Sequence, residues 1–349
     1  MKHILLSLAI ASAWSMVSCE EDAQILNPPV QADYPGGIIA VNEGPFSSGS
    51  GSLTYISADK SRIEQEVFFN VNDYPIGAVL NSGELIDGLL YVVSNVSGRV
   101  EIVNRASMKS EGFIDGLNAP RYVAKAGPGA IAISDWDTDQ VHFYSTNNQQ
   151  LLASVTCGKG PERMYSFFDR LYVLNSGGFE RDSTVTVINL SNFTVEATLM
   201  VGDIPNSGVL DNGYLWVLTS GFADWNDPSQ DTEGNIVGIN LTTLALEYNI
   251  PVPLSVGHPG DLIRNSNGQL CFLSNAYGGS IMEWDGNNSF LQKKKGTYYA
   301  LDYDHVRNQV VAGNALSFAE PGWMVILNSD WMIQDSIPVG LIPTDFVFN

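Results

Sequence analysis

Short apolar strands alternate with polar turns at a nearly constant spacing along residues 37–349. Each copy of the pattern consists of a proline, an apolar strand, a turn, and a second apolar strand that ends in small polar residues. The prolines that open the copies stand 45, 41, 44, 54 and 84 residues apart, at Pro75, Pro120, Pro161, Pro205, Pro259 and Pro343. The last interval spans two periods, because the copy near 298–301 lacks its proline. A period of about 40–45 residues built only from strands predicts a β-propeller with one four-stranded sheet, or blade, per repeat.

The second strand of each copy is the clearest, because apolar residues follow one another there with few interruptions, as in a sheet that is buried on both faces. Seven such runs occur, at Ile38–Val41, Leu90–Val93, Ile131–Ile133, Leu171–Leu174, Leu215–Leu218, Leu270–Leu273 and Val310–Ala312. An alternating third strand such as Thr184–Ile188 and an outer strand such as Val195–Val201 complete a copy. We therefore predict an all-β fold, a seven-bladed β-propeller with four-stranded blades.

The two ends of the repeat region complement each other. The region begins at Gly37 with a second strand, whereas residues 342–349 supply only a proline turn and an innermost strand. We expect the C-terminal strand to complete the first blade, which closes the ring and removes exposed sheet edges.

The first 19 residues have the pattern of a targeting signal. Lys2 and His3 precede an apolar run of 14 residues, Ile4–Val17, which is shorter than the roughly 20 residues that cross a bilayer. The run ends in Met-Val-Ser-Cys, which resembles a bacterial lipobox whose cysteine, Cys19, is lipidated, although methionine replaces the usual leucine. An ordinary cleaved signal with an incidental Cys19 is the alternative. The acidic Glu20–Asp22 resembles the surface-export signal of Bacteroidetes lipoproteins or simply begins a solvated linker.

These features predict three parts: a signal peptide at 1–18, a lipidated N-terminus with a flexible, proline-containing tether at 19–36, and the propeller at 37–349. The expected location is the outer membrane, with the protein exposed at the cell surface and attached to the membrane only through its lipid.

The net charge indicates which classes of partner to expect, and the cysteines indicate whether a disulfide bond forms. Without residues 1–18, the chain has 16 basic and 38 acidic residues, a net charge of −22. Because so acidic a surface repels phosphate backbones, we expect no nucleic-acid partner. Apart from Cys19, the cysteines are Cys157 and Cys271, at different strand positions of different repeats. Buried free thiols are therefore a simpler interpretation than a disulfide.

The loops between second and third strands should rim the central funnel, on the same face as the proline turns. Small polar residues end every second strand there, and they either contact a ligand or satisfy turn backbones. Aromatic residues gather in the same loops, where they either form a recognition surface with the amides or pack onto their own blades. The candidate ligand-binding residues on these loops are Asn42, Phe46, Asn95, Asp135, Trp136, Asn175, Phe179, Phe222, Trp225, Asn275, Tyr277, Asn314 and Trp323.

Arg121 and Arg163 complete the candidate set, because each comes directly after a proline turn. On so acidic a protein, they could anchor a carboxylate or phosphate on the loop face. A salt bridge between blades is the alternative.

Enzyme chemistry finds little support in the sequence. The histidines of the repeat region lack metal-ligand spacing, and neither a nucleophile elbow nor a Cys–His arrangement occurs. The acidic loop 224–233 could hold calcium, yet it lacks the order of residues of an EF-hand. Glu43, Asp135 and Asn175 leave open a metal-dependent lactonase or hydrolase. We expect a non-enzymatic protein without a cofactor or metal site.

The repeats resemble those of a known family. Leu171–Gly178, Val185–Asn189 and Val201–Pro205 are similar to YncE-like, surface-layer-type propellers, and the chain as a whole, including Gly340–Asn349, is similar to the Bacteroidetes branch. This resemblance covers nearly all of the mature chain, and its motifs are specific for the fold rather than for a ligand. It implies capture of cobalamin at the cell surface for a TonB-dependent transporter, as in some members. A protein- or glycan-binding envelope scaffold is the alternative.

Overall fold

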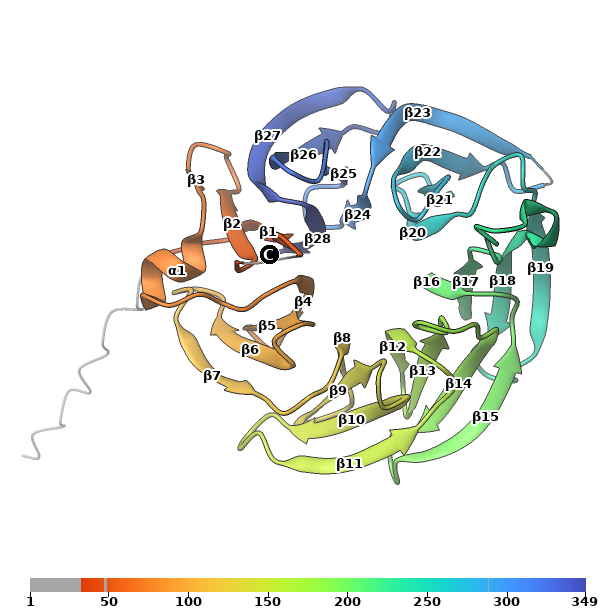
Figure 1. Cartoon of the computed structure of the whole chain (residues 1–349), viewed down its shortest axis with the longest axis horizontal. Coiled ribbons are helices and arrows are strands. Elements are labelled where there is room, and N and C mark those ends of the chain that lie inside the picture. Colours follow the sequence, from red (N-terminus) through yellow and green to blue (C-terminus); the bar gives the residue numbers. More distant parts are fainter. Residues whose placement is uncertain (1–32, 47–48, 288) are drawn as a thin grey trace, which may run out of the picture. The chain divides into compact units, whose positions relative to one another are not determined.

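Seven four-stranded antiparallel sheets form a closed ring around a central channel (Figure 1). The computed structural model describes residues 33–46, 49–287 and 289–349, so the predicted signal peptide, Cys19 and the tether up to residue 32 lie outside the described residues. The prediction of an all-β, seven-bladed propeller is confirmed. In the described part of the chain, no helix has the length and apolar character needed to cross a membrane.

Each blade runs from an innermost strand at the channel to an outer strand. Blade 1 consists of β28 (Pro343–Phe348), β1 (Gly37–Asn42), β2 (Ser52–Ser57) and β3 (Ile63–Glu64), and blade 2 of β4 (Leu80–Ile86), β5 (Leu89–Ser94), β6 (Arg99–Asn104) and β7 (Ser110–Ile114). Blade 3 consists of β8 (Pro120–Lys125), β9 (Ala130–Asp135), β10 (Gln140–Ser145) and β11 (Leu151–Thr156). Blade 4 consists of β12 (Pro161–Phe167), β13 (Arg170–Asn175), β14 (Thr184–Asn189) and β15 (Thr194–Met200). Blade 5 consists of β16 (Pro205–Asp211), β17 (Tyr214–Thr219), β18 (Gly234–Asn240) and β19 (Leu246–Val252). Blade 6 consists of β20 (Gly260–Arg264), β21 (Leu270–Leu273), β22 (Gly279–Trp284) and β23 (Phe290–Tyr298). Blade 7 consists of β24 (Ala300–Asp304), β25 (Gln309–Asn314), β26 (Pro321–Leu327) and β27 (Ile333–Leu341).

The seven predicted second strands are confirmed as β1, β5, β9, β13, β17, β21 and β25. Their apolar runs are explained by packing between blades. Ile131 and Ile133 of β9, for example, belong to one buried cluster with Val93 and Val100 of the preceding blade. Because both faces of such a strand contact neighbouring sheets, it carries few polar residues.

The C-terminal strand closes the ring as predicted. In β28, Phe348 pairs with Ile38 and Phe346 pairs with Ala40 of β1 in antiparallel register. The amide of Gly37 donates to the carbonyl of Asn349 at 2.9 Å. The first blade therefore joins strands from opposite ends of the repeat region, and β28 covers the edge of β1 that would otherwise be unpaired.

Two details of the repeat differ from the sequence prediction. The copies are not built only from strands, because helix α1 (Val67–Asn72) and a 3₁₀ turn, η1 (Pro228–Gln230), interrupt the pattern. Pro75 does not open a strand, since β4 begins five residues later at Leu80. Val79, directly before Leu80, has a φ of 54°, and Ile204, directly before Pro205, has a φ of 57°. Leu80 therefore occupies the position of the repeat proline. The helix therefore displaces the proline from the strand.

Candidate functional site

The second-to-third-strand loops and the proline turns lie at one end of the channel, which we call the loop face. A repeated backbone hydrogen bond joins them. The amide of Ser176 donates to the carbonyl of Gly160 at 2.9 Å, and that of Ser220 donates to Ile204 at 2.9 Å. We call the opposite end, where first strands turn into second strands, the turn face. The predicted common face of loops and proline turns is confirmed.

Several of the small polar residues at the ends of the second strands are used inside the protein. Asn42, Asp135 and Asn175 are fully buried. The Asp135 carboxylate accepts from the amide of Asn118 at 2.8 Å, and the Asn175 side-chain amide donates to Thr186 Oγ1 at 2.9 Å. These three side chains hold the turns of their own blades.

The asparagines of three other blades also bond to nearby backbone. The amides of Tyr277 and Leu316 donate to Asn275 Oδ1 and Asn314 Oδ1, at 2.8 and 2.9 Å. Asn95 is half-buried, and its Nδ2 donates to the carbonyl of Pro120 at 3.0 Å. Asn275 is exposed, so it combines a turn-stabilising role with access to solvent at the loop face.

The aromatic loop residues are the most exposed of the candidates. Phe179 is 88 % exposed, Trp225 84 %, Tyr277 75 % and Phe46 72 %. They rise from the loops of blades 4, 5, 6 and 1. We call this set of four residues the aromatic rim.

Four other aromatic side chains accompany the aromatic rim on the loop face. Trp323 and Phe318 of blade 7 are partly exposed, and Trp136 and Phe222 are half-buried. Trp323 lies in the third strand, β26, rather than in the loop where it was predicted. The Trp136 and Phe179 rings meet edge to face, with their centroids 5.6 Å apart. Phe318 meets Tyr299 in the same way at 5.2 Å. Loops of six blades thus place aromatic rings at the loop face.

Arg121 is paired within the ring of blades. Its Nη2 lies 2.9 Å from Oε1 of Glu162 on the neighbouring blade, and its guanidinium carbon lies 3.9 Å from the centre of the Trp136 ring. The buried Glu43 accepts a hydrogen bond from the Tyr299 hydroxyl at 3.3 Å, and burial raises the pKa of Glu43 to about 7. The blade-to-blade salt bridge considered as an alternative is therefore present at Arg121.

A second group of polar side chains lines the channel itself. The inner strands alternate between blade and channel, so the residue two positions after each repeat proline, or after its replacements Leu80 and Ala300, points inward. Together these residues form a seven-membered channel ring: Ser82, Tyr122, Arg163, Ser207, Asp261, Asp302 and Asp345. They line a cavity of about 840 Å³.

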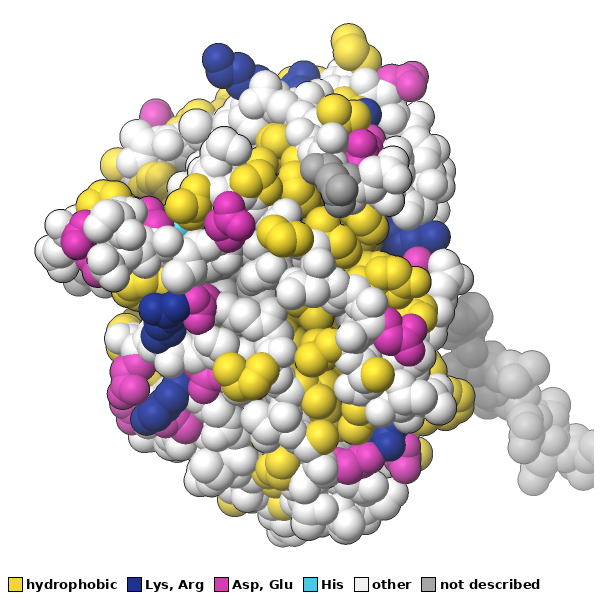
Figure 2. Space-filling view, turned by 90° about the vertical axis from the view of Figure 1, so that its right-hand side faces the viewer, with side chains coloured by type: hydrophobic (Ala, Val, Ile, Leu, Met, Phe, Trp, Pro, Cys, Tyr) yellow, Lys and Arg dark blue, Asp and Glu magenta, His cyan; other side chains and the backbone are white. Residues whose placement is uncertain are grey.

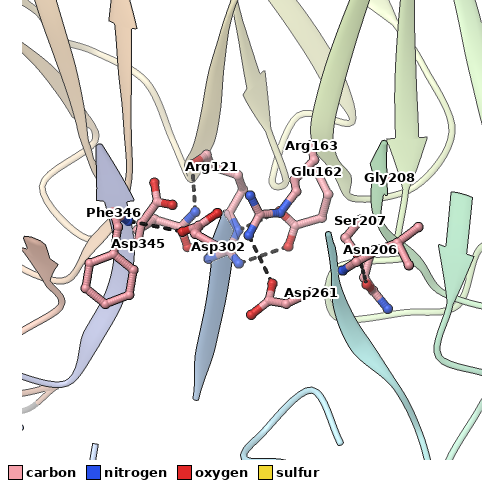
Figure 3. Close-up of polar contacts among 12 residues, drawn as sticks. Arg121, Glu162, Arg163, Asn206, Ser207, Gly208, Asp261, Asp302, Asp345 and Phe346 are labelled. Atoms are coloured by element: carbon pink, nitrogen blue, oxygen red, sulfur yellow. Dashed lines mark hydrogen bonds and ion pairs between the residues drawn. The ribbon is translucent and has the colours of Figure 1, made fainter. Parts of the chain in front are cut away.

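Arg163 lies in this channel rather than on the loop face where it was expected. Its Nη2 is 3.1 Å from Oδ1 of Asp261, so the pair spans from blade 4 to blade 6 (Figure 3). On the intervening strand β16, Ser207 holds the channel position and Gly208 follows it, and the small size of these two residues leaves room for the contact. The Arg163 guanidinium also lies 4.8 Å from the Tyr122 ring centre.

Three further carboxyl groups face the channel from β24, β28 and β4. Asp345 Oδ2 accepts from the amide of Gly83 at 2.8 Å, and Asp302 Oδ2 accepts from the amide of Phe346 at 3.3 Å. Burial raises the pKa of Glu84 to about 7, with Asp345 adding to the effect, and burial raises the pKa of Asp345 to about 6. Burial and the neighbouring Asp345 also raise the pKa of Asp302.

Of this group, only Arg163 is among the candidate residues predicted from the sequence. The missed residues, Glu84, Asp261, Asp302 and Asp345, stand on inner strands rather than in loops. A signal was nevertheless present, because the position two residues after the prolines carries Tyr, Arg, Ser, Asp and Asp in five copies. A core strand would place apolar residues there.

Residues 36–220 match the model of a family described as "Domain of unknown function (DUF5074)". The chain belongs to the DUF5074 family. Among curated proteins, none matches the sequence of this DUF5074 protein.

Solved structures share the propeller fold of this DUF5074 protein. A quinonprotein alcohol dehydrogenase-like protein from Bacteroides thetaiotaomicron is 13 % identical, with a TM-score of 0.66 over 90 % of this chain and 78 % of that one. Kuenenia stuttgartiensis hydrazine synthase is 12 % identical, with a TM-score of 0.60 over 76 % and 88 %. Virginiamycin B lyase from Staphylococcus aureus is 9 % identical, with a TM-score of 0.57 over 74 % and 84 %. At these identities the similarity shows only a shared fold. The three proteins are named for different functions, so no activity is inferred for this chain from them.

The DUF5074 chain offers two distinct chemical surfaces. The loop face carries aromatic rings beside amides and a buried carboxyl, a composition suited to binding a flat, partly apolar ligand. The channel carries carboxyls, the guanidinium groups of Arg163 and Arg264, and the imidazole of His305. Within residues 33–46, 49–287 and 289–349, no three His, Cys, Asp or Glu side chains are grouped closely enough to hold a metal ion.

Proposed function

We propose that this protein is a ligand-binding surface lipoprotein that captures a planar, amphipathic molecule on its loop face, with cobalamin as the best specific candidate. The observation that carries the proposal is the aromatic rim, four strongly exposed aromatic side chains on loops of the same face. The proposal includes attachment to the outer membrane through Cys19 and delivery of the ligand to a TonB-dependent transporter, in line with the resemblance to Bacteroidetes propellers.

The physical argument is the cost of leaving large aromatic rings in water. Phe179 and Trp225 each hold an apolar ring in solvent, and burial of such surface against a ligand is favourable by roughly 25 cal/mol per Å². A corrin ring offers a broad apolar face for stacking and peripheral amides for hydrogen bonds. Exposed groups such as Asn275 can pair with those amides.

The way the chain enters the ring supports presentation of the loop face. The amide of Tyr34 donates to the carbonyl of Ala106 at 2.9 Å, and Arg105 Nη1 donates to the carbonyl of Tyr34 at 3.2 Å. Residues 105 and 106 belong to the turn that joins β6 to β7, on the turn face. The described chain therefore begins on the turn face, and the proposal assigns the loop face to the ligand and the transporter.

The proposal is tested by titrating the protein with cyanocobalamin and following tryptophan fluorescence and thermal stability. The chain offers a matched pair of variants. Phe179, on the loop face, is 88 % exposed, and Phe168, in the turn between β12 and β13 on the turn face, is 87 % exposed. We expect Phe179→Ser to weaken binding about tenfold, the loss of about 1.4 kcal/mol, and Phe168→Ser to leave it unchanged. Absence of both quenching and a thermal shift in the unmodified protein would contradict corrinoid capture.

A protein- or glycan-binding scaffold is the second candidate, and it is favoured by aromatic residues on the side of the ring. Trp216 lies 5.1 Å from Tyr248 and 6.0 Å from Trp284, measured between ring centroids. Figure 2, which views the side where β19 lies, shows hydrophobic side chains in a band with charged groups on both sides. Including neutral oligosaccharides in the thermal-shift experiment separates the two candidates. A shift with oligosaccharides but not with corrinoids would favour the scaffold.

A further inference from the structure

We propose that the channel is a second binding site, which takes a small organic cation, an amine or guanidinium compound, against the carboxylates of Glu84, Asp302 and Asp345. This site lies away from the aromatic rim and does not depend on the proposed capture of cobalamin.

The charges in the channel are divided unequally between its walls. On one side, Arg163 pairs with Asp261 at 3.1 Å, and its charge also offsets part of the rise in the pKa of the three carboxyls opposite. On the other side, the consecutive inner strands β24, β28 and β4 contribute Asp302, Asp345 and Glu84. In the described part of the chain, no Lys, Arg or His lies within ion-pair distance of these three carboxyls. Figure 3 shows Asp302 and Asp345 close together, with the Arg163 guanidinium directed to Asp261.

Two of these carboxyls have unused hydrogen-bonding capacity. Asp345 is only 7 % exposed, and just one of its oxygens, Oδ2, accepts a hydrogen bond, from Gly83. Glu84 projects into the water-accessible cavity, and no hydrogen bond or ion pair joins its carboxyl to another described side chain or to the described backbone. Asp345 is thus a nearly enclosed carboxylate without an ion-pair partner among the described residues, which is unfavourable, whereas Glu84 is exposed to the water of the cavity. A ligand with N–H donors and a positive charge would donate hydrogen bonds to the unused carboxylate oxygens and would compensate their negative charge.

The arrangement suits an organic cation better than a metal ion. Across the described residues, no three acidic, histidine or cysteine side chains converge on one point. The carboxyls instead come from three neighbouring strands along the wall, where a cation with several N–H donors can reach more than one of them. The volume, about 840 Å³, is within the roughly 300–1,000 Å³ of small-molecule sites.

Access to this site is separate from the loop face. The cavity lining includes Ser266 and His305, in the turns that join first to second strands, and it includes none of the aromatic rim. At the loop-face end, the Arg121–Glu162 pair spans adjacent inner strands. The cavity therefore reaches the turn face, and a ligand that enters there need not compete with one on the aromatic rim.

The proposal is tested by calorimetric titration of the purified protein with spermidine. Because the protein is strongly acidic, it also attracts polyamines without specificity. Glu84→Gln and Asp345→Asn are therefore compared with Asp330→Asn, which removes the same charge from an exposed turn between β26 and β27. We expect one saturable site in the unmodified protein. Its affinity should fall at least tenfold in Glu84→Gln and Asp345→Asn and stay unchanged in Asp330→Asn.

Other outcomes overturn the proposal. No saturable binding, or equal affinity in all three variants, excludes a cation site at these carboxyls. Stronger binding of citrate than of spermidine would assign the channel to anions through Arg163. Each variant is first checked by its thermal unfolding. Glu84→Gln is the decisive one, because it breaks no hydrogen bond or ion pair within the described part of the chain. Phe179→Ser should bind spermidine normally, so failure here is distinguishable from failure of the proposed loop-face function.

Discussion

The guanidinium of Arg163 reaches across blade 5 to the carboxylate of Asp261, which is 98 residues later in the chain and lies 3.1 Å away. This pair ties two non-adjacent blades together through the channel. It also explains why an arginine is accepted on an inner strand, because its charge is matched within the protein. Removing one partner leaves the other charge enclosed and unpaired.

We therefore expect Arg163→Met to lower the free energy of unfolding by about 2–3 kcal/mol, less than a fully buried pair would give because both side chains retain some contact with solvent. Urea denaturation measures this change. The double variant Arg163→Met with Asp261→Asn should recover part of the loss, since no unpaired charge then remains. An unchanged midpoint in the single variant would mean that the pair contributes nothing to stability.

Glu84→Gln should stabilise the protein at pH 8 and have little effect at pH 4.5. Enclosure in the channel raises the pKa of Glu84 from about 4.5 to about 7 in the folded state. The folded protein thus holds this proton more tightly than the unfolded chain does. The resulting stabilisation is complete below about pH 4.5 and is lost as the pH rises through about 7.

The glutamine variant cannot ionise, so it avoids that loss. Its expected advantage at pH 8 is about 1 kcal/mol, a value reduced for the solvent that reaches the channel. Melting temperatures at pH 4.5 and 8 measure the difference, with Asp330→Asn as the control for net charge. An equal shift at both pH values would rule out the titration of Glu84 as its cause.

Deletion of residues 344–349 should abolish cooperative unfolding. The deletion removes nearly all of β28, which pairs with β1 from Ile38 to Asn42. Without it, the edge of β1 is exposed and the buried side chains of Phe346 and Val347 are lost from the junctions between blades. Circular dichroism during heating detects the change. A sharp transition at the original temperature would show that the ring does not require its C-terminal strand.

Phe168→Asn should raise stability slightly. Phe168 begins a two-residue turn and adopts a φ of 51°, a left-handed conformation that bulky residues adopt at a cost. The equivalent turns of blades 2 and 5 begin with Asp87 and Asn212, which tolerate this conformation. We expect a gain of about 0.5 kcal/mol, because the lost edge contact with Phe167 offsets part of the relief. A lower urea midpoint would mean that this contact outweighs the strain.

The repeat spacing and the apolar second strands were sufficient to predict the number of blades and the closure of the ring. Both depend on local patterns, because every second strand meets the same environment between two sheets. The place of Leu80 was not predictable in this way. An inserted helix, α1, separates Pro75 from its strand, and the equivalence of Leu80 with the repeat prolines is visible only in the backbone conformation of the preceding residue.

The candidate site was predictable only in part. The exposed aromatic residues could be found because their loops interrupt the strand pattern. Five members of the channel ring stand two residues after a repeat proline, but recognising the ring required the alternation of the inner strand to be applied to every copy. The contact between Arg163 and Asp261 depends on the width of the channel and on the small Ser207 and Gly208 between them. Spacing along the chain carries no information about that width.

Asp345 stands on β28, the strand that completes the first blade without a hairpin to its neighbour β1. Detachment of this strand would open the ring and withdraw the carboxyl from the cavity in one event. A molecule bound to Asp345 would thus act as a latch, because mass action would favour the closed ring in proportion to its occupancy. Binding of a ligand in the channel and closure of the ring would then be thermodynamically coupled.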